Sequence, residues 1–548
     1  MMKNKNIYAF SIGLILLIIG TFSFIYWGQK KEVWFCDEIY SYESANGFEQ
    51  EWPSEEKGIW MTGEDIEDFM AADSDELSLN SITVRLYNDH VPLYFWLFRM
   101  VSLFIFKGSA TIWIGLSINL FFYLFVLALG YWMFWHLTKK PMVSAVVMIV
   151  IGVVNRLMLM QATMLRMYMM LLWVELLLLL AGFWILRDVE RDKMSPWVFI
   201  YMFFASVTGL LTHYDYWIFY AVTAMLFCMW LLVVAVKKKK KVFWVSREFK
   251  YVLAWVGNFG VSLFVTTLIF PYCKWNLNRG KGKMALSAVF DFSAEKLQNI
   301  AWGYERLVAS AFGGIVSTGC GFALMCGCIL GGAVVLYKRK DISKLVGMIL
   351  TVLVSQGYQF IVCFTLPDAR EERYLWGTFT FMAACMAWGA VLLLQELFSI
   401  IKTETIRKKI QWIAGIVLTA FVLCMELKII DGGNQIAYLF HGDKDVALLE
   451  EYSEVPWVVY GPTLGVYSYY DWLIPEQICF VTQYGTPEDV AALRVLEDED
   501  YFVIYLHEGY YDQALELLQR ELQKELTGKY LTQSTNLNVY LISTQGTE

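Results

Sequence analysis

Charged residues are scarce in this sequence, and its cysteines follow no functional spacing. Asp, Glu, Lys and Arg make up 18% of the 548 residues, whereas 57% are hydrophobic and 17% are aromatic. An ordinary soluble domain does not reach this apolar content. Most of the ten cysteines lie inside apolar runs, where a thiol acts as a small hydrophobic group, and none has zinc-ligand spacing. We therefore expect neither a disulfide framework nor a structural zinc site.

A glycine-rich phosphate loop and an internal repeat are also missing. The first absence argues against a nucleotide-binding role, and the second argues against a transporter built from two inverted halves. The net charge of −8 is sorted along the chain, because short loops between apolar runs are basic and residues 28–89 and 431–548 are acidic. The acidity therefore belongs to surfaces outside a membrane, and we expect no nucleic-acid partner.

Eleven apolar runs are long enough to cross a lipid bilayer. They cover residues 7–27, 110–136, 141–157, 167–186, 196–213, 216–236, 250–271, 308–337, 343–366, 374–397 and 410–430. The first run lacks a small-residue cleavage site, which indicates a retained anchor rather than a removed signal peptide. These runs predict a polytopic α-helical protein of the plasma membrane.

The segment His90–Lys107 is apolar enough to cross the membrane but carries Arg99 near its centre. If this segment crosses, the basic loops fall outside the cell. If it lies in the interface, they fall in the cytoplasm together with Lys3 and Lys5, as the positive-inside bias requires. We therefore expect eleven spans plus one interfacial helix, a cytoplasmic N-terminus and an extracytoplasmic C-terminus.

This topology places three loops, 28–89, 272–306 and 367–374, on the outer face together with the block 431–548. That block alternates β-rich runs with amphipathic stretches such as Tyr510–Leu526, a pattern typical of a small α/β domain. Its β-rich runs are Trp457–Tyr460, Ile478–Thr482, Tyr501–Leu506 and Leu537–Ser543. Because only short basic loops remain on the cytoplasmic face, an active site should face outward.

We divide the chain accordingly into two domains. Residues 1–430 form the membrane domain, which includes the first outer loop and the interfacial helix, 28–107. Residues 431–548 form the extracytoplasmic α/β domain.

Two adjacent carboxylates, Asp37 and Glu38, follow the first span at the membrane surface. Charge held beside hydrocarbon is costly and has a perturbed proton affinity, so an acid in this position indicates a function. The alternative is that the pair simply begins a hydrated acidic loop.

Further polar residues lie at the ends of spans on the expected outer face. They are His90, Arg166, Tyr168, Thr212, His213, Tyr214, Asp215, Arg370, Glu371, Glu372, Arg373 and Tyr374. Each one alone can be explained as an interfacial anchor or a hydrogen-bond partner. Together they suit a reaction in which a base activates a nucleophile while cations receive an anionic leaving group such as phosphate.

The order of short motifs along the chain resembles that of the GT-C superfamily of membrane glycosyltransferases. The motifs are DE after the first span, H-x-P-L-Y at the start of the surface helix, then R-M-Y, T-H-Y and E-R-Y-L. Over about residues 1–400 the chain is most similar to the family of protein O-mannosyltransferases and the bacterial aminoarabinose transferase, glycosyltransferase family 39. The resemblance implies a GT-C fold and a hexosyltransferase of cell-envelope glycosylation whose donor is a sugar on a polyprenyl phosphate.

The resemblance also implies roles for single residues. Asp37 matches the acid that the family uses as catalytic base, and Glu38 is its neighbour in the catalytic pair. Val91 stands where the family motif has its first proline, and Thr163–Leu165 replace the Gln-Glu-Ala that usually precedes R-M-Y, so no counterpart of that glutamate is carried over. The implied substrate-binding residues are His90, Tyr94, Arg166, Tyr168, His213, Tyr214, Arg370, Arg373 and Tyr374.

The expected chemistry is an inverting displacement. Asp37 accepts the proton of an acceptor hydroxyl, which attacks the anomeric carbon, while Arg370 or Arg373 stabilises the departing lipid phosphate. The acceptor is a protein, a lipid or a wall polymer, and the lipid bilayer is the other partner. No cofactor is required, and a divalent metal on Asp37, Glu38 or His90 is an open alternative.

Two other functions compete with the enzyme. A polytopic transporter or lipid flippase should show broken helices near the middle of the membrane. A non-catalytic assembly or sensor protein would use its outer α/β domain and would not need Asp37.

Two features inside the spans have competing interpretations. Glu175 lies in the middle of a span, where an acid indicates function by default, but it is expected to pair with Arg156 or to bond a neighbouring helix. The glycines of 313–332 indicate close packing of helices through small residues rather than a broken transporter helix.

Overall fold

The structure is a computed structural model in which the chain forms two compact units. The residues it describes are 2–31, 34–46, 58–72, 78–86, 90–238, 243–273, 283, 287–288, 293–365, 370–430, 436, 443–461, 469–482, 491–507, 509–534 and 537–544. The first unit consists of Met1–Gln29, Thr83–Tyr94 and Leu116–Ile436, and the second of Lys30–Ile82, Phe95–Gly115 and Ala437–Glu548. Parts of the expected outer loops 272–306 and 367–374 lie outside the described residues.

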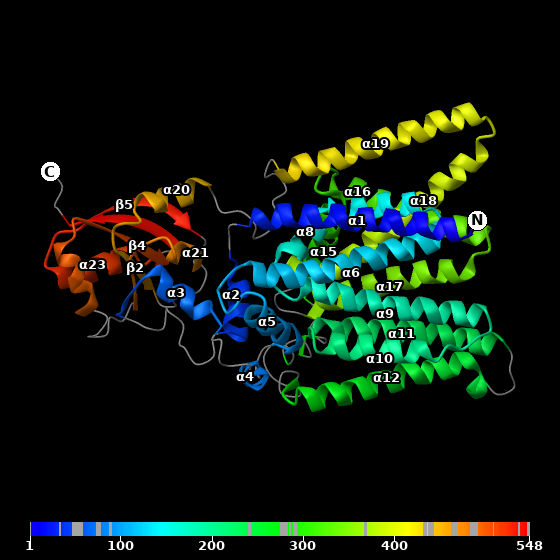
Figure 1. Ribbon diagram of the computed structural model, residues 1–548, viewed down its shortest axis with the longest axis horizontal. Helices are drawn as coiled ribbons and strands as arrows, with labels where there is room; N and C mark the ends of the chain where they lie inside the picture. The colour runs from blue at the N-terminus through cyan, green and yellow to red at the C-terminus, as the bar shows by residue number, and fades with distance from the viewer. Residues whose placement is uncertain are drawn as a thin grey trace. The chain divides into compact units, whose positions relative to one another are not determined.

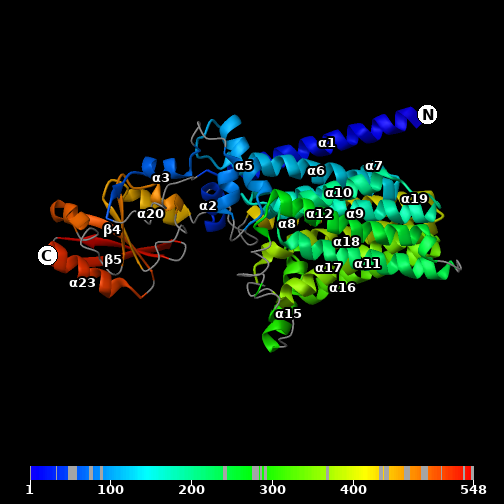
Figure 2. The ribbon, with the colours of Figure 1, turned by 90° about the horizontal axis from the view of Figure 1, so that it is seen from below.

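The first unit is a bundle of apolar helices (Figures 1 and 2). Within the described residues, nine helical segments are long and apolar enough to cross a membrane. They belong to α1 (Met2–Gln29), α6 (Trp113–Thr138), α9 (Tyr168–Glu190), α11 (Asp215–Lys237), α12 (Arg247–Ile269), α16 (Thr318–Lys338), α17 (Ile342–Thr365), α18 (Trp376–Ile400) and α19 (Glu404–Ile430). This confirms the expected multi-pass helical membrane protein.

Two further apolar helices, joined at a bend of 60°, form either a broken span or a re-entrant loop. The first, α7 (Pro141–Met148), continues into the π-helical turn η1 (Ile149–Val153), and the second is α8 (Arg156–Thr163). The side chain of Asn155 accepts a hydrogen bond from the Leu157 amide and so caps the start of α8. The apolar helix α10 (Trp197–Leu210) has 14 residues, fewer than the ~20 of a typical span. The described residues therefore contain nine candidate spans, or ten if the bent pair crosses, and the eleven expected from the sequence would also require α10 to cross.

The apolar run 308–337 is not one span, and this expectation is wrong. Helix α15 (Ala294–Phe312) ends there at Gly313 and Gly314, whose φ angles are +59° and +68°. Glycine adopts this left-handed conformation without steric cost, so the pair ends the helix. The crossing segment within the run is α16 alone.

Glycines also let two helices of the bundle approach closely. A Cβ atom on Gly332 of α16 would lie 2.6 Å from the Cα of Gly389 on α18, and one on Gly389 would lie 2.1 Å from the carbonyl oxygen of Cys328. No larger residue fits at either position. The expected close packing through small residues is therefore confirmed for this pair of helices.

Helix α19 lies at the edge of the bundle (Figure 1). Only 6% of its most apolar window is buried inside the protein. Its last turn is attached to the α15–α16 turn, where the Lys428 ammonium donates to the Gly314 carbonyl at 3.1 Å and Met425 lies beside Gly313. Most of its surface is therefore suited to contact with lipid.

The second unit is organised around a six-stranded mixed sheet. The strand order is β1-β3-β2-β4-β6-β5, with β2 parallel to both β3 and β4 and the other pairs antiparallel. The strands are β1 (Trp60–Met61), β2 (Trp457–Gly461), β3 (Ile478–Thr482), β4 (Tyr501–His507), β5 (Thr527–Ser534) and β6 (Leu537–Ser543). Helix α23 (Tyr511–Leu522) packs its apolar side, including Leu518, on the sheet. The expected small α/β domain is confirmed.

The edge strand β1 comes from the first outer loop and not from the C-terminal block. Trp60 pairs with Cys479 and Met61 with Ile478 on β3. A strand of two residues is too short to show the alternation that marks a strand, so no sequence pattern predicts that this loop joins the sheet.

The remaining helices of the second unit come from the first outer loop, the surface segment that follows it and the C-terminal block. They include α2 (Cys36–Ala45), α3 (Gly63–Met70), α4 (Leu79–Arg85), α5 (Leu93–Phe104), α20 (Asp443–Glu451) and α21 (Tyr469–Trp472). Short turns of 3-10 helix are η2 (Phe243–Val245), η3 (Glu372–Leu375) and η5 (Leu493–Asp498).

Helix α5 is the segment that carries Arg99. Its 12 residues rise only ~18 Å, which is too short for a bilayer core of ~30 Å. Arg99 is fully buried, and its Nη1 atom donates to the carbonyl of Asn46, at the C-terminal end of α2, at 3.5 Å. A cation is favourable at that end of a helix, which explains an arginine in the middle of an apolar segment.

Candidate functional site

A buried arginine–histidine contact lies in the membrane unit. The Nη2 atom of Arg166 lies 3.0 Å from Nε2 of His90. An arginine guanidinium can only donate hydrogen bonds, so Nε2 of His90 is the acceptor and Nδ1 of His90 carries the ring proton. Arg166 lies between α8 and α9 and is almost fully buried, so the contact holds a positive charge away from water.

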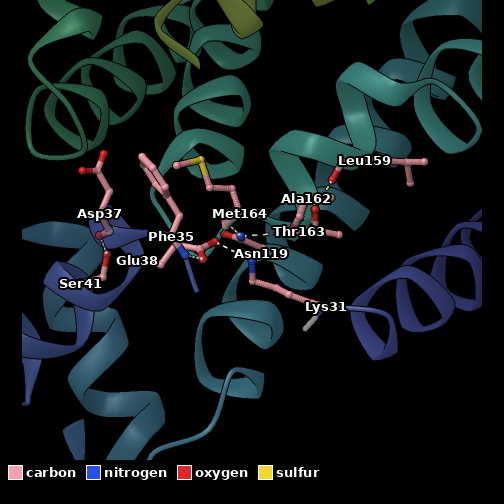
Figure 3. A network of polar contacts seen from close by, with 10 residues as sticks. All are labelled: Lys31, Phe35, Asp37, Glu38, Ser41, Asn119, Leu159, Ala162, Thr163 and Met164. Carbon is pink, nitrogen blue, oxygen red and sulfur yellow. Dashed lines mark hydrogen bonds and ion pairs between the residues drawn. The ribbon is translucent and has the colours of Figure 1, made fainter. Parts of the chain in front are cut away.

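The turn that carries Arg166 is fixed by helix α6. The side-chain amide of Asn119 donates to the carbonyls of Ala162 and Met164, at the end of α8, and Asn119 is fully buried (Figure 3). The Arg166 amide in turn donates to the Met164 carbonyl at 2.7 Å. No sequence pattern singles out Asn119, because its role depends on two carbonyls at the end of another helix.

Aromatic contacts bring the R-M-Y, T-H-Y and E-R-Y-L motifs together. The ring centroids of Tyr168 and His213 are 5.8 Å apart, and those of His213 and Tyr374 are 6.5 Å apart. The guanidinium of Arg373 lies 5.4 Å from the centroid of the Tyr374 ring, in cation–π range. Residues far apart in the sequence and predicted to share a site are therefore neighbours within the membrane unit.

The E-R-Y-L turn, η3, and the neighbouring Arg370 are held by two helices, α15 and α17. The Tyr358 hydroxyl of α17 donates to the Tyr374 carbonyl at 2.9 Å, and the Ser310 hydroxyl of α15 donates to Glu372 at 2.6 Å. Arg370 donates to the side-chain carbonyl of Asn299, also on α15, at 3.0 Å. Arg370 is thus engaged with α15, whereas Arg373 is the cation beside Tyr374.

An acidic neighbour also contacts Arg373. One carboxylate oxygen of Glu371 lies 3.4 Å from Nη1 of Arg373, and the Glu371 side chain is 44% exposed. An ion pair with a partly solvated carboxylate is weak, so it leaves the guanidinium able to exchange Glu371 for a stronger anion.

His213 is oriented by Asp215, a residue that the sequence analysis placed at the surface but not in the site. The backbone amide of Asp215 donates to Nδ1 of His213 at 3.1 Å, and its carboxylate lies 3.2 Å from the same atom. Because the amide opens helix α11 and has no partner within the helix, it is an obligatory donor. Nδ1 then acts as acceptor, and Nε2 of His213 carries the proton.

Glu175 meets helix α18 rather than Arg156. Its side chain is 1% exposed, and a Cβ atom on Gly377, in the first turn of α18, would lie 2.1 Å from Oε2. The charges that act on Arg156 are those of Glu372 and Arg306. The expected hydrogen bond to a neighbouring helix is not seen for the Oε2 atom of Glu175, which has no hydrogen-bond partner among the described residues and packs against Gly377 instead.

The paired acids Asp37 and Glu38 lie in the second unit and have different surroundings. Glu38 is fully buried, 3.0 Å from the Lys31 ammonium, and accepts from the Phe35 amide at 2.8 Å. Burial lowers the pKa of Lys31, and the attraction of Glu38 opposes this shift. The Asp37 side chain is half-buried, and its carboxylate points in another direction from that of Glu38 (Figure 3).

The remaining predicted site residues are Tyr94 and Tyr214. Tyr94 is fully buried, and Tyr214 is half-buried with its ring 6.0 Å from that of Trp217.

An apolar cavity of about 90 Å³ lies within the helical bundle. Its wall includes Leu172 and Leu176, one and two turns beyond Tyr168 on α9, and Thr380, one turn beyond Trp376 on α18. The same two helices therefore carry polar site residues at one end and apolar cavity wall farther along.

No metal centre stands out in the part of the chain that the structure describes. Among those residues no group of three or more His, Cys, Asp or Glu side chains is arranged to hold a metal ion. Glu38 is already bonded to an ammonium and an amide, which leaves it little capacity to bind a cation.

No family model matches this sequence, and no curated protein matches it. Solved structures do match it. Two are of ArnT from Cupriavidus metallidurans, in the apo state and bound to undecaprenyl phosphate, with 10% and 9% identity, 96% of this chain and 97% of theirs covered, and TM-scores of 0.47 and 0.49.

A third match is the archaeal oligosaccharyltransferase AglB from Archaeoglobus fulgidus, in complex with an inhibitory peptide and a dolichol-phosphate. It has 12% identity and a TM-score of 0.44, and the match covers 99% of this chain and 75% of that one.

Proposed function

We propose that the protein is a glycosyltransferase that faces the outside of the cell and moves a sugar from a polyprenyl-phosphate donor to an acceptor hydroxyl. The supporting observation is that α9 and α18 combine polar site residues with the wall of an apolar cavity. Its volume of about 90 Å³ is below the ~300–1,000 Å³ of a typical ligand pocket, so it has room for only part of an apolar chain. A ligand with an anionic head and an apolar tail suits this arrangement.

The anionic head is assigned to Arg373 and Arg166. A guanidinium presents a planar set of donors that matches two phosphate oxygens. Tyr374 and His213 complete the head-group site, with the Nε2 proton of His213 as a further donor. Part of the apolar tail is assigned to the cavity.

The proposed reaction is an inverting displacement. Asp37 takes the proton of the acceptor hydroxyl as its oxygen bonds to the anomeric carbon, and the bond from that carbon to the phosphate oxygen breaks. The lipid phosphate leaves as an anion, which Arg373 stabilises. Base catalysis of this kind contributes ~10²–10⁴ in rate, and a preorganised donor to the leaving group ~10²–10³.

The decisive experiment is the variant Asp37→Asn in lipid nanodiscs. We expect turnover of a polyprenyl-phosphate sugar to fall at least ~10²-fold, because the amide cannot accept the proton. Affinity for undecaprenyl phosphate should stay unchanged, since the head-group site lies on other residues. Near-normal turnover would remove Asp37 as the base. Full activity after treatment with a metal chelator is also expected, because the scheme does not use a metal.

A transporter or lipid flippase is the second candidate, and the bent pair α7–α8 favours it. A crossing that bends by 60° is the kind of broken helix that transporters use. Movement of a labelled lipid-linked sugar across a proteoliposome membrane, without transfer to any acceptor, would support this function instead.

A further inference from the structure

The helix that carries Asp37 is anchored at its far end by one buried residue. Asn46 follows the last turn of α2 and is 3% exposed. Its side-chain amide donates to the Met70 carbonyl at 3.1 Å and to the Ser102 hydroxyl at 3.2 Å. Since Met70 ends α3 and Ser102 lies on α5, Asn46 joins three helices of the second unit.

The opposite end of α3 is attached to the β-sheet of the same unit. The Trp60 indole donates to the Ala492 carbonyl at 2.9 Å, and the Gly58 amide donates to Phe480 at 3.0 Å. At the first residue of α3, Gly63, a Cβ atom would lie 2.9 Å from the Leu473 carbonyl oxygen. The contact is tight enough that only glycine fits without displacement.

Helix α3 connects these two attachments. Its eight residues begin at a reciprocal cap, in which the Asp65 amide donates to Thr62 and the Thr62 amide donates to Asp65 at 2.7 Å. The hydrogen bonds from Thr62 lower the pKa of Asp65. The chain of contacts therefore runs from the sheet through β1 and α3 to Asn46, and from there along α2 to Asp37.

Neither β1 nor α3 can hold this position without the sheet. A helix of eight residues is marginal in water, and a strand of two residues has no stability of its own. The sheet, in contrast, has a buried core that includes Val458, Ile504 and Leu518.

From this geometry we propose that the C-terminal α/β domain is the scaffold that positions Asp37, with Trp60, Gly63 and Asn46 as positioning residues. The proposal rests on the function proposed above, in which Asp37 is the base. It assigns the C-terminal domain a role in the turnover step and none in binding the lipid phosphate.

Cys36 provides a direct readout of the position of α2. It is the first residue of the helix, directly before Asp37, and its thiol is buried and forms no disulfide. An exposed thiol reacts with a membrane-impermeant maleimide, and a buried one reacts only when the structure opens locally. Peptide-level mass spectrometry then reports labelling at Cys36 separately from the other cysteines.

The test compares Trp60→Ala with Tyr530→Ala. Tyr530 lies on β5, the opposite edge of the same sheet, and is 53% exposed. In Trp60→Ala we expect Cys36 labelling to rise and kcat to fall by about tenfold or more, with affinity for undecaprenyl phosphate within about twofold. In Tyr530→Ala all three quantities should stay within about twofold of the unchanged protein.

Gly63→Ala serves as the second variant if Trp60→Ala fails to fold, and the same changes are expected from it. Unchanged Cys36 labelling in a folded variant would overturn the proposal, and so would an equal rise in Tyr530→Ala, which would indicate general loss of stability. If the unchanged protein transfers no sugar at all, the proposed function fails, whereas Cys36 labelling still decides whether the sheet positions α2.

Discussion

Asp37 and Glu38 are adjacent in the sequence but have different tasks in the folded chain. Successive residues of a helix point in different directions, so one carboxylate can face inward while its neighbour does not. Glu38 is the inward one, and its bonds to Lys31 and the Phe35 amide fix the first turn of α2. We therefore assign the chemistry to Asp37 and the orientation of the helix to Glu38.

Removal of Lys31 should destabilise the second unit. Lys31→Met leaves the buried carboxylate of Glu38 without its cation, which typically costs about 3–5 kcal/mol. In the double variant Lys31→Met/Glu38→Gln most of the loss should be recovered, because the glutamine oxygen still accepts from the Phe35 amide. Chemical unfolding of the two variants measures this, and an equal loss in both would contradict the interpretation.

The same pair predicts a dependence of stability on pH. Because burial lowers the pKa of Lys31 in the folded state, the unfolded chain binds more protons between that pKa and the ordinary lysine value of 10.5. The free energy of unfolding should therefore rise as the pH is raised through this window. The rise should be absent in Lys31→Met/Glu38→Gln, and its persistence there would assign it to another group.

Arg373 should contribute to binding of the donor phosphate. Lysine keeps the charge but loses the planar fork, so Arg373→Lys should bind undecaprenyl phosphate more weakly and Arg373→Ala most weakly. Removing a charged hydrogen bond costs about 1.5–3 kcal/mol, or roughly ten- to a hundredfold in affinity. Equal affinity in all three proteins would leave Arg373 as an interfacial anchor.

Many residues of the candidate site could be predicted from the sequence, and others could not. His90, Arg166, Tyr168, His213 and Tyr374 were singled out by motif and position, and the structure brings them into contact. The contributions of other groups depend on partners from distant helices, which no local pattern reveals. These groups are Asn119, Tyr358 and Gly377.

At the level of elements, the packing of Glu175 against the first turn of α18 leads to a test. Gly377→Ala would bring a methyl group into contact with the Glu175 carboxylate, so it should shift this turn and with it Arg373 and Tyr374. Glu175→Asp shortens the side chain by one methylene and should restore the space. We expect Gly377→Ala to weaken binding of undecaprenyl phosphate about tenfold, and the double variant to recover most of it.

Hydrogen exchange of the amides in the first turn of α18 measures displacement of this turn independently of function. Faster exchange in Gly377→Ala and recovery in Gly377→Ala/Glu175→Asp are expected. Failure of the double variant to recover either exchange or binding would show that the contact with Glu175 is not what limits this position.

The helices themselves were predicted well where an uninterrupted apolar run has the length of a span. The run 308–337 was wrongly predicted to be one span. Gly313 and Gly314 are as apolar by composition as their neighbours, but their backbone conformation ends a helix. Hydropathy measures the free energy of transfer from water to lipid and carries no information on the backbone φ angle.

At the level of the whole molecule, the orientation in the membrane remains a prediction with a direct test. A cysteine at Lys107, after α5, should react with an impermeant reagent added outside the cell, because the positive-inside bias places this loop there. A cysteine at Lys340, between α16 and α17, should react only after the membrane is opened. The reverse labelling pattern would place the N-terminus outside the cell and the C-terminus in the cytoplasm.

The origin of β1 has a consequence for how the protein is made. β1 leaves the ribosome long before β3, and the membrane helices are synthesised between them. At ~5–20 residues per second, Trp60 and Met61 wait on the order of tens of seconds for their partner strand. The sheet is completed only when the chain has returned to the side of the membrane where it left β1. Pairing of β1 with β3 therefore depends on correct insertion of the helices between them. A nascent chain with a wrongly inserted helix lacks this pairing and presents an unpaired strand to quality control.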